Sequence, residues 1–252
     1  MRVIAINGSM RKERSSTNHI LKPFLEGMEL AGAQTEQIML GHLNIKPCLG
    51  CFLCWVKSPG KCVQDDDMAE VLEKYVQADL IIMGTPLYHY TMSGLLKNFI
   101  DRTLPMDEPW LVERRHLNHL TGHPERYPKE RSLFLVSPCG LPEFDHFEAL
   151  VHHFRYYAHH CGFNYLGEIL RPAAESLSKA DMQGMFGWYY DLLRQAGEQL
   201  VKQGSISSEL QIELKRDLFP GGVPAFRQHA NQYWAEEMKK FGVNGRVLLI
   251  DQ

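Results

Sequence analysis

The feature that most constrains the fold is a repeated alternation of short apolar runs with longer segments of helical periodicity. Most of these runs are rich in Val, Ile and Leu and lack polar alternation, which is typical of strands buried on both faces of a parallel sheet. The predicted strands are residues 2–6, 35–40, 79–84, 131–137 and 163–170. Strands that alternate with helices predict a doubly wound α/β fold, a five-stranded parallel sheet in the order 2-1-3-4-5 with right-handed crossovers.

The predicted strands lie within residues 1–172, and the chain continues well beyond them. Residues 173–252 show helical periodicity with aromatic and Met-rich faces, so we expect an appended helical arm. Such faces pack on the same domain or on a partner subunit, and we therefore expect a homodimer or a homotetramer. Residues 104–130 are Pro-rich and long for a connection, which indicates a lid or a subunit contact.

A hydroxyl-rich loop follows the first predicted strand and leads into a helix. Ser9, Ser16 and Thr17 supply hydroxyl groups there, and Arg11 supplies a positive charge. Backbone N–H groups at a helix N-terminus bind anions, so this loop is a candidate phosphate site. Its spacing fits neither a dinucleotide fingerprint nor a P-loop. The alternative interpretation is an N-cap in an ordinary polar loop.

A second candidate loop follows the third predicted strand. It contains Pro86, Leu87, Tyr88 and His89, which is the composition of a site for a flat ring, because Pro fixes the backbone and Tyr offers a stacking face. In the predicted strand order, the loops after the first and third strands meet where the order reverses, so we expect one shared site. The alternative is a hydrophobic turn.

A third loop follows the fourth predicted strand and contains Ser137 and Gly140. By analogy within this fold it faces the same site, because the carboxyl ends of parallel strands lie at one edge of the sheet.

Four of the six cysteines lie in the loop 47–62, with the spacing C-x2-C-x2-C-x7-C. They are Cys48, Cys51, Cys54 and Cys62. Three thiols in a tight loop with a fourth nearby is the pattern that holds a [4Fe–4S] cluster. Zinc sites more often combine C-x2-C with a distant second pair, so zinc is the weaker metal interpretation. Structural or redox-active thiols are a further alternative.

The acidic run Asp65-Asp66-Asp67 resembles a cation site but indicates the start of a helix. Consecutive carboxylates do not converge on one calcium ion as alternating loop ligands do. Asp67 as N-cap and Glu70 three residues later instead predict a capping box.

Charge and hydropathy exclude several classes of partner. The chain has 27 Lys and Arg against 30 Asp and Glu with no long run of one sign, so we expect no binding to nucleic acid and none to an anionic membrane. No apolar stretch has the length of a membrane-spanning helix. The N-terminus enters the first strand directly, too soon for a signal-peptide core, and we expect a cytoplasmic protein with reduced thiols.

Taken together, the motifs of residues 1–103 resemble the NAD(P)H-dependent FMN reductase family of flavodoxin-like proteins, and within it the iron–sulfur flavoproteins. The matching stretches are Gly8-Ser9-x-Arg11-Lys12, the cysteine loop ending in Gly60-Lys61-Cys62, Asp66-Asp67-Met68, Gly84-Thr85-Pro86-Leu87-Tyr88 and Leu96-Lys97-Asn98-Phe99-Ile100-Asp101-Arg102. Met10 stands where the family usually has Pro, and Ser15-Ser16-Thr17 replaces Gly-Asn-Thr while retaining hydroxyl chemistry.

The resemblance implies an FMN-dependent oxidoreductase that moves electrons from NAD(P)H or a reduced protein donor to a quinone, a flavin or another acceptor. The residues that would hold the FMN phosphate are Ser9, Arg11, Ser16 and Thr17, and those that would line the isoalloxazine ring are Pro86, Leu87, Tyr88 and His89. No catalytic acid or base is expected, because the flavin N5 accepts the hydride. A [4Fe–4S] cluster would add a one-electron exit.

Two alternatives to this function are open at the level of the sequence. The first is a non-enzymatic electron carrier that docks on protein partners, such as a ferredoxin-like protein, and binds no nicotinamide. The second is a structural protein that has lost its cofactor.

Overall fold

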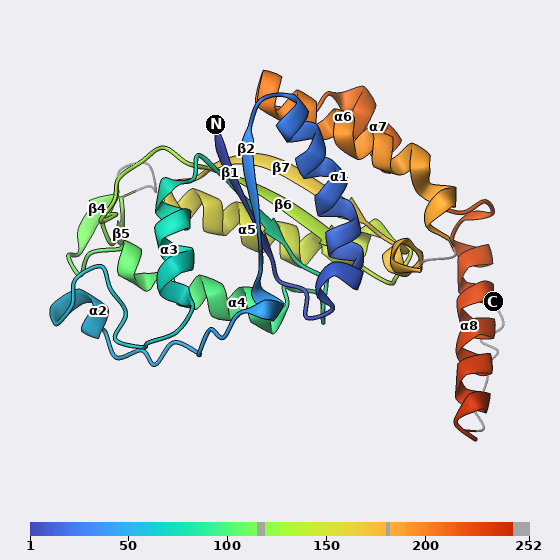
Figure 1. Ribbon diagram of the computed structural model, residues 1–252, viewed down its shortest axis with the longest axis horizontal. Coiled ribbons are helices and arrows are strands. Elements are labelled where there is room, and N and C mark those ends of the chain that lie inside the picture. The colour runs from blue at the N-terminus through green and yellow to red at the C-terminus, as the bar shows by residue number, and fades with distance from the viewer. Residues whose placement is uncertain (115–118, 180–181, 244–252) are drawn as a thin grey trace.

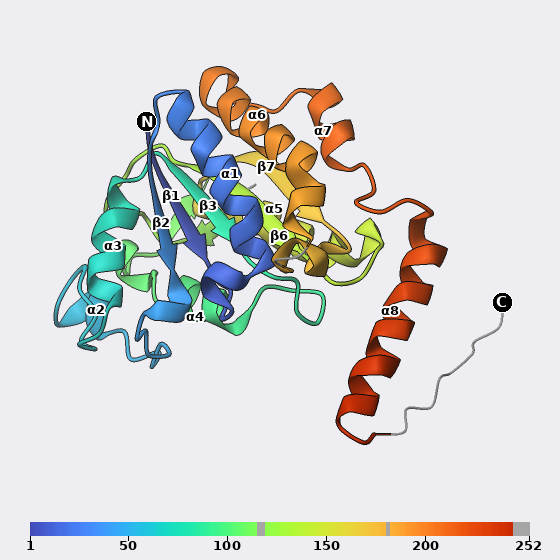
Figure 2. The same cartoon turned by 45° about the vertical axis from the view of Figure 1, so that its right-hand side comes forward.

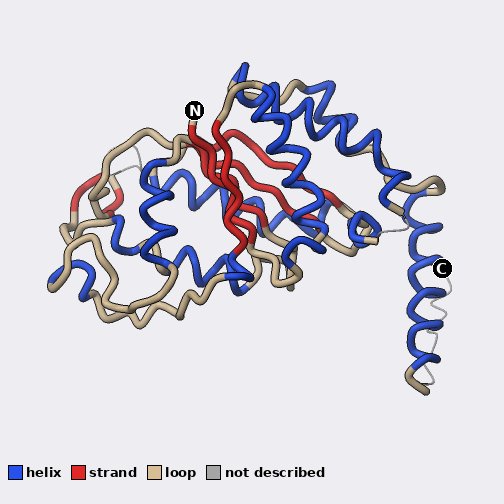
Figure 3. Tube along the Cα trace, in the orientation of Figure 1, coloured by secondary structure: helices blue, strands red, loops and turns tan. Residues whose placement is uncertain are grey.

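The computed structural model describes residues 1–114, 119–179 and 182–243 and has a parallel sheet at its centre (Figures 1 and 3). The strands of this sheet are β1 (Arg2–Asn7), β2 (Gln34–Met39), β3 (Leu80–Gly84), β6 (Ser132–Pro138) and β7 (Asn164–Arg171). Their order is β2-β1-β3-β6-β7, and every neighbouring pair is parallel. The predicted five-stranded order 2-1-3-4-5 is therefore confirmed, with β6 and β7 as the fourth and fifth strands.

Strand composition follows position in the sheet. The central strand β3 is buried at every residue, which explains its unbroken apolar sequence. The edge strand β2 alternates between exposed and intermediate residues over 34–37, where its sequence is polar, and becomes buried at Ile38.

Helices cover both faces of the sheet. One face carries α1 (Ser16–Leu30) and α6 (Gly187–Gln203), and the other carries α3 (Met68–Gln77), α4 (Gly94–Asp101) and α5 (Glu148–Cys161). A hydrophobic core lies on each face of the sheet, the first with α1 and α6 and the second with α3, α4 and α5. Successive residues of β1 contribute to the two cores in turn, because side chains alternate along a strand. Val3 and Ala5 join the first core, whereas Ile4 and Ile6 join the second.

The helices α1 and α6 approach each other at the level of their backbones. A Cβ added to Gly27 would lie 1.9 Å from the carbonyl oxygen of Arg194, and one added to Gly197 would lie 2.1 Å from that of Phe24. The two glycines therefore permit a contact that no larger residue would allow. Through it, the first helix of the C-terminal segment shares a core with the sheet.

Two further helices complete the C-terminal segment. α7 (Ser208–Leu214) is held by the buried Arg171 of β7, which donates hydrogen bonds to the carbonyl oxygens of Leu214 and Arg216 near the end of the helix. α8 (Gly222–Lys240) extends away from the sheet, as Figure 2 shows, and contains no buried residue.

The segment 104–130 forms a short antiparallel hairpin, β4 (Val112–Arg114) and β5 (Leu120–Gly122), next to the cysteine loop. Trp55 of the short helix α2 (Leu53–Val56) packs against His123 in a tilted arrangement, with ring centroids 4.7 Å apart, and its Nε1 donates to the carbonyl oxygen of Leu104. Residues 115–118 of this segment and residues 244–252 lie outside the described residues. No helix in the described ranges is long and apolar enough to span a membrane.

Candidate functional site

Three loops meet at the carboxyl edge of the sheet, after β1, β3 and β6. The backbone N–H of Gly8 donates to the carbonyl oxygen of Gly84 at 2.7 Å, and the hydroxyl of Ser93 donates to that of Gly8 at 2.6 Å. These bonds join the first loop to the second. A Cβ on Gly8 would lie 2.9 Å from the Ser93 hydroxyl and from Leu96, so the close approach requires glycine.

The second and third loops are joined in the same way. Ser137 is fully buried, and its hydroxyl donates to the carbonyl oxygen of Thr85 at 2.8 Å. The N–H of Leu87 donates to the carbonyl oxygen of Pro138 at 2.9 Å. The three loops predicted to share a site therefore lie together, and Ser137 holds two of them in place instead of pointing outward.

The N-terminus of α1 presents the candidate phosphate residues. Ser9, Ser16 and Thr17 are all buried, and the hydroxyl of Ser9 accepts from the N–H of Arg11 at 3.3 Å. Ser15, which the sequence analysis did not select, is the N-cap: its hydroxyl accepts from the N–H of Asn18 at 3.1 Å. The polar residue directly before the helical periodicity was the available signal for this cap.

The hydroxyl of Thr17 is buried and has no hydrogen-bond partner within the described residues. A buried hydroxyl without a partner costs free energy of about 1–3 kcal/mol. Its position in the first turn of α1, where free N–H groups favour anions, fits a bound phosphate. The residues present at this edge therefore fit an FMN phosphate.

Arg11 does not point at these hydroxyls. Its guanidinium donates to Glu175 at 2.9 Å and to Ser178 at 3.3 Å, which joins the loop after β1 to the segment after β7. Both partners of the Arg11–Glu175 pair are about half exposed, and such pairs contribute about 0–1 kcal/mol, so the guanidinium can exchange partners at low cost. Gly140 is exposed beside Glu175.

The loop after β3 contains a tight turn that the sequence analysis missed. The N–H groups of Tyr88 and Thr91 each donate to the other residue's carbonyl oxygen, at 2.9 and 3.0 Å. The two residues between them, His89 and Tyr90, have positive φ angles of 46° and 65°. This is a type I′ geometry, which usually requires Asn or Gly, so the turn is strained. It leaves the rings of Tyr88 and Tyr90 about half exposed at the edge of the sheet, whereas Pro86 and Leu87 are half-buried.

Cys139, at the start of the third loop, is not a reactive thiol. Its sulfur donates to the carbonyl oxygen of Leu141 at 3.1 Å, and burial raises the pKa of its thiol to about 11. The thiol is therefore protonated at neutral pH.

The other candidate centre is a pocket lined by all four clustered cysteines, together with Arg102 at the end of α4. Cys48 and Cys51 are exposed, Cys54 is buried and Cys62 is intermediate, and all are free thiols. Burial, and next the charge of Cys62, raise the pKa of Cys54. The donor set fits a thiolate-bound metal. As the side chains lie, however, no group of three or more His, Cys, Asp or Glu among the described residues is close enough to hold a metal ion.

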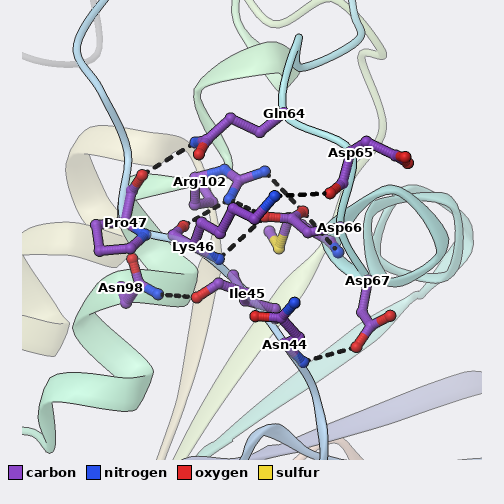
Figure 4. A network of polar contacts seen from close by, with 11 residues as sticks. Asn44, Ile45, Lys46, Pro47, Gln64, Asp65, Asp66, Asp67, Asn98 and Arg102 are labelled. Carbon is purple, nitrogen blue, oxygen red and sulfur yellow. Dashed lines mark hydrogen bonds and ion pairs between the residues drawn. The ribbon is translucent and has the colours of Figure 1, made fainter.

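A buried ion pair closes the base of the cysteine loop (Figure 4). Arg102 donates to both carboxylate oxygens of Asp66, at 2.7 and 2.9 Å, and to the carbonyl oxygen of Lys46 at 2.5 Å. The side chains of Arg102 and Asp66 are 1% and 0% exposed. Since Lys46 precedes the cysteine loop and Asp66 follows it, the pair holds the two ends of the loop together.

The acidic run begins α3 as predicted, but the predicted capping box is wrong. Asp66, not Asp67, accepts from the backbone N–H of Met68, at 3.2 Å. The carboxylate of Asp67 accepts instead from the N–H of Asn44 at 2.6 Å. Asp66 thus serves both the helix and Arg102, a pairing across 36 residues that local sequence patterns do not reveal.

Comparison with known proteins identifies the family that the first half of the chain resembles. Residues 1–122 match the family model described as NADPH-dependent FMN reductase. The resemblance stated from the sequence is thereby confirmed over these residues.

Curated relatives match the same half of the chain. An iron-sulfur flavoprotein of Methanocaldococcus jannaschii is 40% identical over 106 residues, which make up 42% of this chain and 53% of that protein. One from Archaeoglobus fulgidus is 41% identical over 103 residues, or 41% and 49% of the two chains. An FMN-dependent NADH:quinone oxidoreductase of Methylorubrum extorquens is 49% identical over 82 residues, 32% of each chain. The match thus spans about half the length of the iron-sulfur flavoproteins.

Solved structures extend the likeness to most of the fold. An FMN-dependent NADH-azoreductase from Bacillus anthracis, in complex with FMN, has a TM-score of 0.57 at 15% identity, over 80% of this chain and 100% of that chain. An NAD(P)H:quinone oxidoreductase from Methanothermobacter marburgensis has a TM-score of 0.56 at 16% identity, over 79% and 98% of the two chains. At these identities the likeness shows a flavodoxin-like fold.

Proposed function

Because residues 1–122 match the NADPH-dependent FMN reductase family, we propose that this chain binds FMN at the carboxyl edge of its sheet and acts as an FMN-dependent NAD(P)H oxidoreductase. The observation that carries the proposal is the buried, unpartnered hydroxyl of Thr17 at the N-terminus of α1. It lies in the loop and helix turn whose sequence is typical of a phosphate site, and a phosphate oxygen would satisfy it.

The proposed phosphate site combines hydroxyls with one exchangeable charge. Three buried hydroxyl groups lie together in sequence around the start of α1: Ser9 in the preceding loop, and Ser16 and Thr17 in the first turn. When FMN binds, the Arg11 guanidinium would move from Glu175 to the phosphate. A doubly charged phosphate attracts a guanidinium more strongly than an exposed, singly charged carboxylate does.

The proposed ring site is the loop after β3, with Pro86, Leu87, Tyr88 and His89. The strained turn keeps Tyr88 at the edge of the sheet, where its ring offers a stacking face. Ser137 supports this loop through the hydrogen bond from its hydroxyl to the carbonyl oxygen of Thr85. Gly140 is exposed and has no side chain, so it would not obstruct a bound ring.

When bound, FMN would supply hydride acceptance from a nicotinamide and release of electrons to an acceptor. The part of this chain is to anchor the phosphate, orient the ring and exclude water from its buried side. No side-chain acid or base is assigned. The acceptor class that the relatives' names favour is a quinone, with a flavin as the alternative.

We propose further that the cysteine pocket holds a [4Fe–4S] cluster. Support comes from the spacing of the four cysteines, from their shared pocket, and from relatives that are named iron-sulfur flavoproteins. The four sulfurs would have to move closer together when the cluster binds, because no three such ligands among the described residues are close enough to hold a metal ion. Metal binding is commonly coupled to the folding of the segment that supplies the ligands. Redox-active thiols and another thiolate-bound metal are the alternatives.

We also propose a cytoplasmic homo-oligomer, a homodimer or homotetramer. Reduced thiols support the location, since all six cysteines are free. The exposed face of α8 supports the assembly, because Tyr233 and Trp234 are 41% and 60% exposed on a helix without buried residues.

Steady-state kinetics of the flavin-loaded protein test the activity. The proposal predicts sustained oxidation of NADH or NADPH with a quinone or ferricyanide as acceptor. Absence of turnover with both nicotinamides, together with reduction by a ferredoxin, would instead make the chain an electron carrier.

A further inference from the structure

Arg102 carries one buried nitrogen that closing the loop does not use. Its two terminal nitrogens donate hydrogen bonds to Asp66 and to the carbonyl oxygen of Lys46, as Figure 4 shows. Its third nitrogen, Nε, is buried and has no hydrogen-bond partner within the part of the chain that the structure describes. An unpaired N–H on a buried cation is costly, so this donor points to a group that is bound at times.

The surroundings of Arg102 indicate what that group is. Arg102 lines the same pocket as Cys48, Cys51, Cys54 and Cys62. The chemistry that this pocket offers to the donor is therefore cysteine sulfur.

A metal centre held by four thiolates would meet this requirement. A divalent metal ion with four thiolates carries a net charge of −2, and so does a [4Fe–4S]2+ core with its four thiolates, so hydrogen-bond donors to the sulfurs stabilise both. The charge of the guanidinium is already balanced by Asp66, so the Nε–H is what Arg102 offers to a centre in the pocket.

We propose that Arg102 is a positioning residue for a thiolate-bound metal centre in the cysteine pocket, with its Nε–H donating a hydrogen bond to a sulfur. This inference rests on the proposal that the four cysteines bind metal. The same guanidinium fixes the ends of the loop, so loop closure and the hydrogen bond to the sulfur depend on one side chain.

The role requires arginine and not merely a positive charge. The planar fork makes three hydrogen bonds through its two terminal nitrogens, to Asp66 and to the carbonyl oxygen of Lys46, and carries a third nitrogen on a residue that lines the pocket. A lysine ammonium could pair with Asp66 but could not also direct a donor into the pocket from the same position.

A pair of variants separates this role from folding. Arg102→Met alone would leave Asp66 buried and unpaired, so the test uses Arg102→Met combined with Asp66→Asn, compared with Asp66→Asn alone. Both variants lack the ion pair, but only the second keeps the Nε donor. Far-UV circular dichroism and FMN binding report whether each full-length variant is folded.

The measurement is titration of the reduced, metal-free protein with Co²⁺ under anaerobic conditions, followed by the thiolate-to-cobalt absorption. We expect the wild type to bind, and the double variant to bind about 10-fold to 100-fold more weakly than Asp66→Asn, the usual effect of losing an outer hydrogen bond. FMN binding should be equal in the two variants.

Each other outcome decides against the inference. Equal Co²⁺ affinity in the two variants would remove Arg102 from the metal site while leaving the cysteine site intact. Wild type that binds neither Co²⁺ nor iron would overturn the metal site and the inference together. Loss of FMN binding in the double variant alone would assign the effect to folding.

Discussion

Ser93 and Arg102 cap the two ends of the same helix, α4, and each belongs to one of the two candidate centres. Ser93 is the N-cap and donates to Gly8 in the proposed flavin site, whereas Arg102 is the C-cap and lines the cysteine pocket. At 1.5 Å per residue, this helix is about 12 Å long. A single rigid element therefore fixes the spacing between the two centres.

The first prediction concerns Thr17. Thr17→Val should weaken FMN binding about tenfold, because it removes one hydrogen bond to the phosphate. It should not destabilise the flavin-free protein, since the hydroxyl has no hydrogen-bond partner among the described residues. Fluorescence titration with FMN and urea unfolding measure the two effects.

The control for Thr17 is Thr103→Val, which removes a hydroxyl that donates to the carbonyl oxygen of Ile100. That variant should bind FMN normally. If Thr17→Val bound FMN as tightly as the wild type, the phosphate would have to lie elsewhere.

The second prediction concerns the exchange of Arg11 between Glu175 and the phosphate. Arg11→Ala should weaken FMN binding and leave the fold intact, because the pair it breaks is exposed. Glu175→Gln should have the opposite effect and strengthen FMN binding, because it releases the guanidinium. Affinities measured at low salt would show both changes most clearly. Unchanged affinity in Arg11→Ala would exclude Arg11 from the phosphate site.

The third prediction concerns the stability contributed by Asp66. Asp66→Asn leaves Arg102 buried without a carboxylate, which should lower the free energy of unfolding by about 3–5 kcal/mol. The matched control is Lys202→Gln, which breaks the exposed pair with Glu198 and should cost less than about 1 kcal/mol. Urea unfolding at neutral pH compares the two variants. Equal losses in the free energy of unfolding would mean that the buried pair contributes no more to stability than an exposed one.

The same pair predicts a pH dependence. Burial tends to raise the pKa of Asp66, but hydrogen bonds from Arg102 and from backbone N–H groups outweigh it and hold the pKa below its usual range. A lowered carboxyl pKa stabilises the fold above the unfolded-state value and loses that effect as pH falls through the folded-state value. The difference between wild type and Asp66→Asn should therefore be largest near neutral pH and shrink below about pH 4. A constant difference would contradict the assignment.

The fourth prediction concerns the contact between α1 and α6. Gly197→Ala places a Cβ 2.1 Å from the carbonyl oxygen of Phe24, so the helices must separate. Overpacking of this kind should cost about 1–3 kcal/mol. Gly187→Ala, whose Cβ would meet nothing within 4 Å, is the control and should change stability little. Thermal unfolding distinguishes the two, and an unaffected Gly197→Ala would mean that α6 does not rest on α1.

The elements that the sequence predicted are those governed by local patterns. The buried strands β1 and β3 are continuous apolar runs, and the strand order then brought the loops of Ser9 and Tyr88 to one edge. The four cysteines fall in one pocket because they are close in sequence.

What the sequence could not reveal depends on long-range contacts or on strain. Arg11 pairs with Glu175 across 164 residues, and Arg102 pairs with Asp66 across 36, and neither partner is marked by spacing. The turn at His89 and Tyr90 has positive φ angles without glycine, which only its surroundings can impose. The unpartnered hydroxyl of Thr17 likewise becomes visible only when its neighbours are in place.

The most direct test is the content of flavin, iron and acid-labile sulfide in anaerobically purified protein. The account predicts stoichiometric FMN with about four iron and four sulfide per chain. Flavin without iron would retain the FMN site and remove the cluster, leaving the cysteines as thiols. Protein that carries no FMN and takes up none on titration would contradict the central claim.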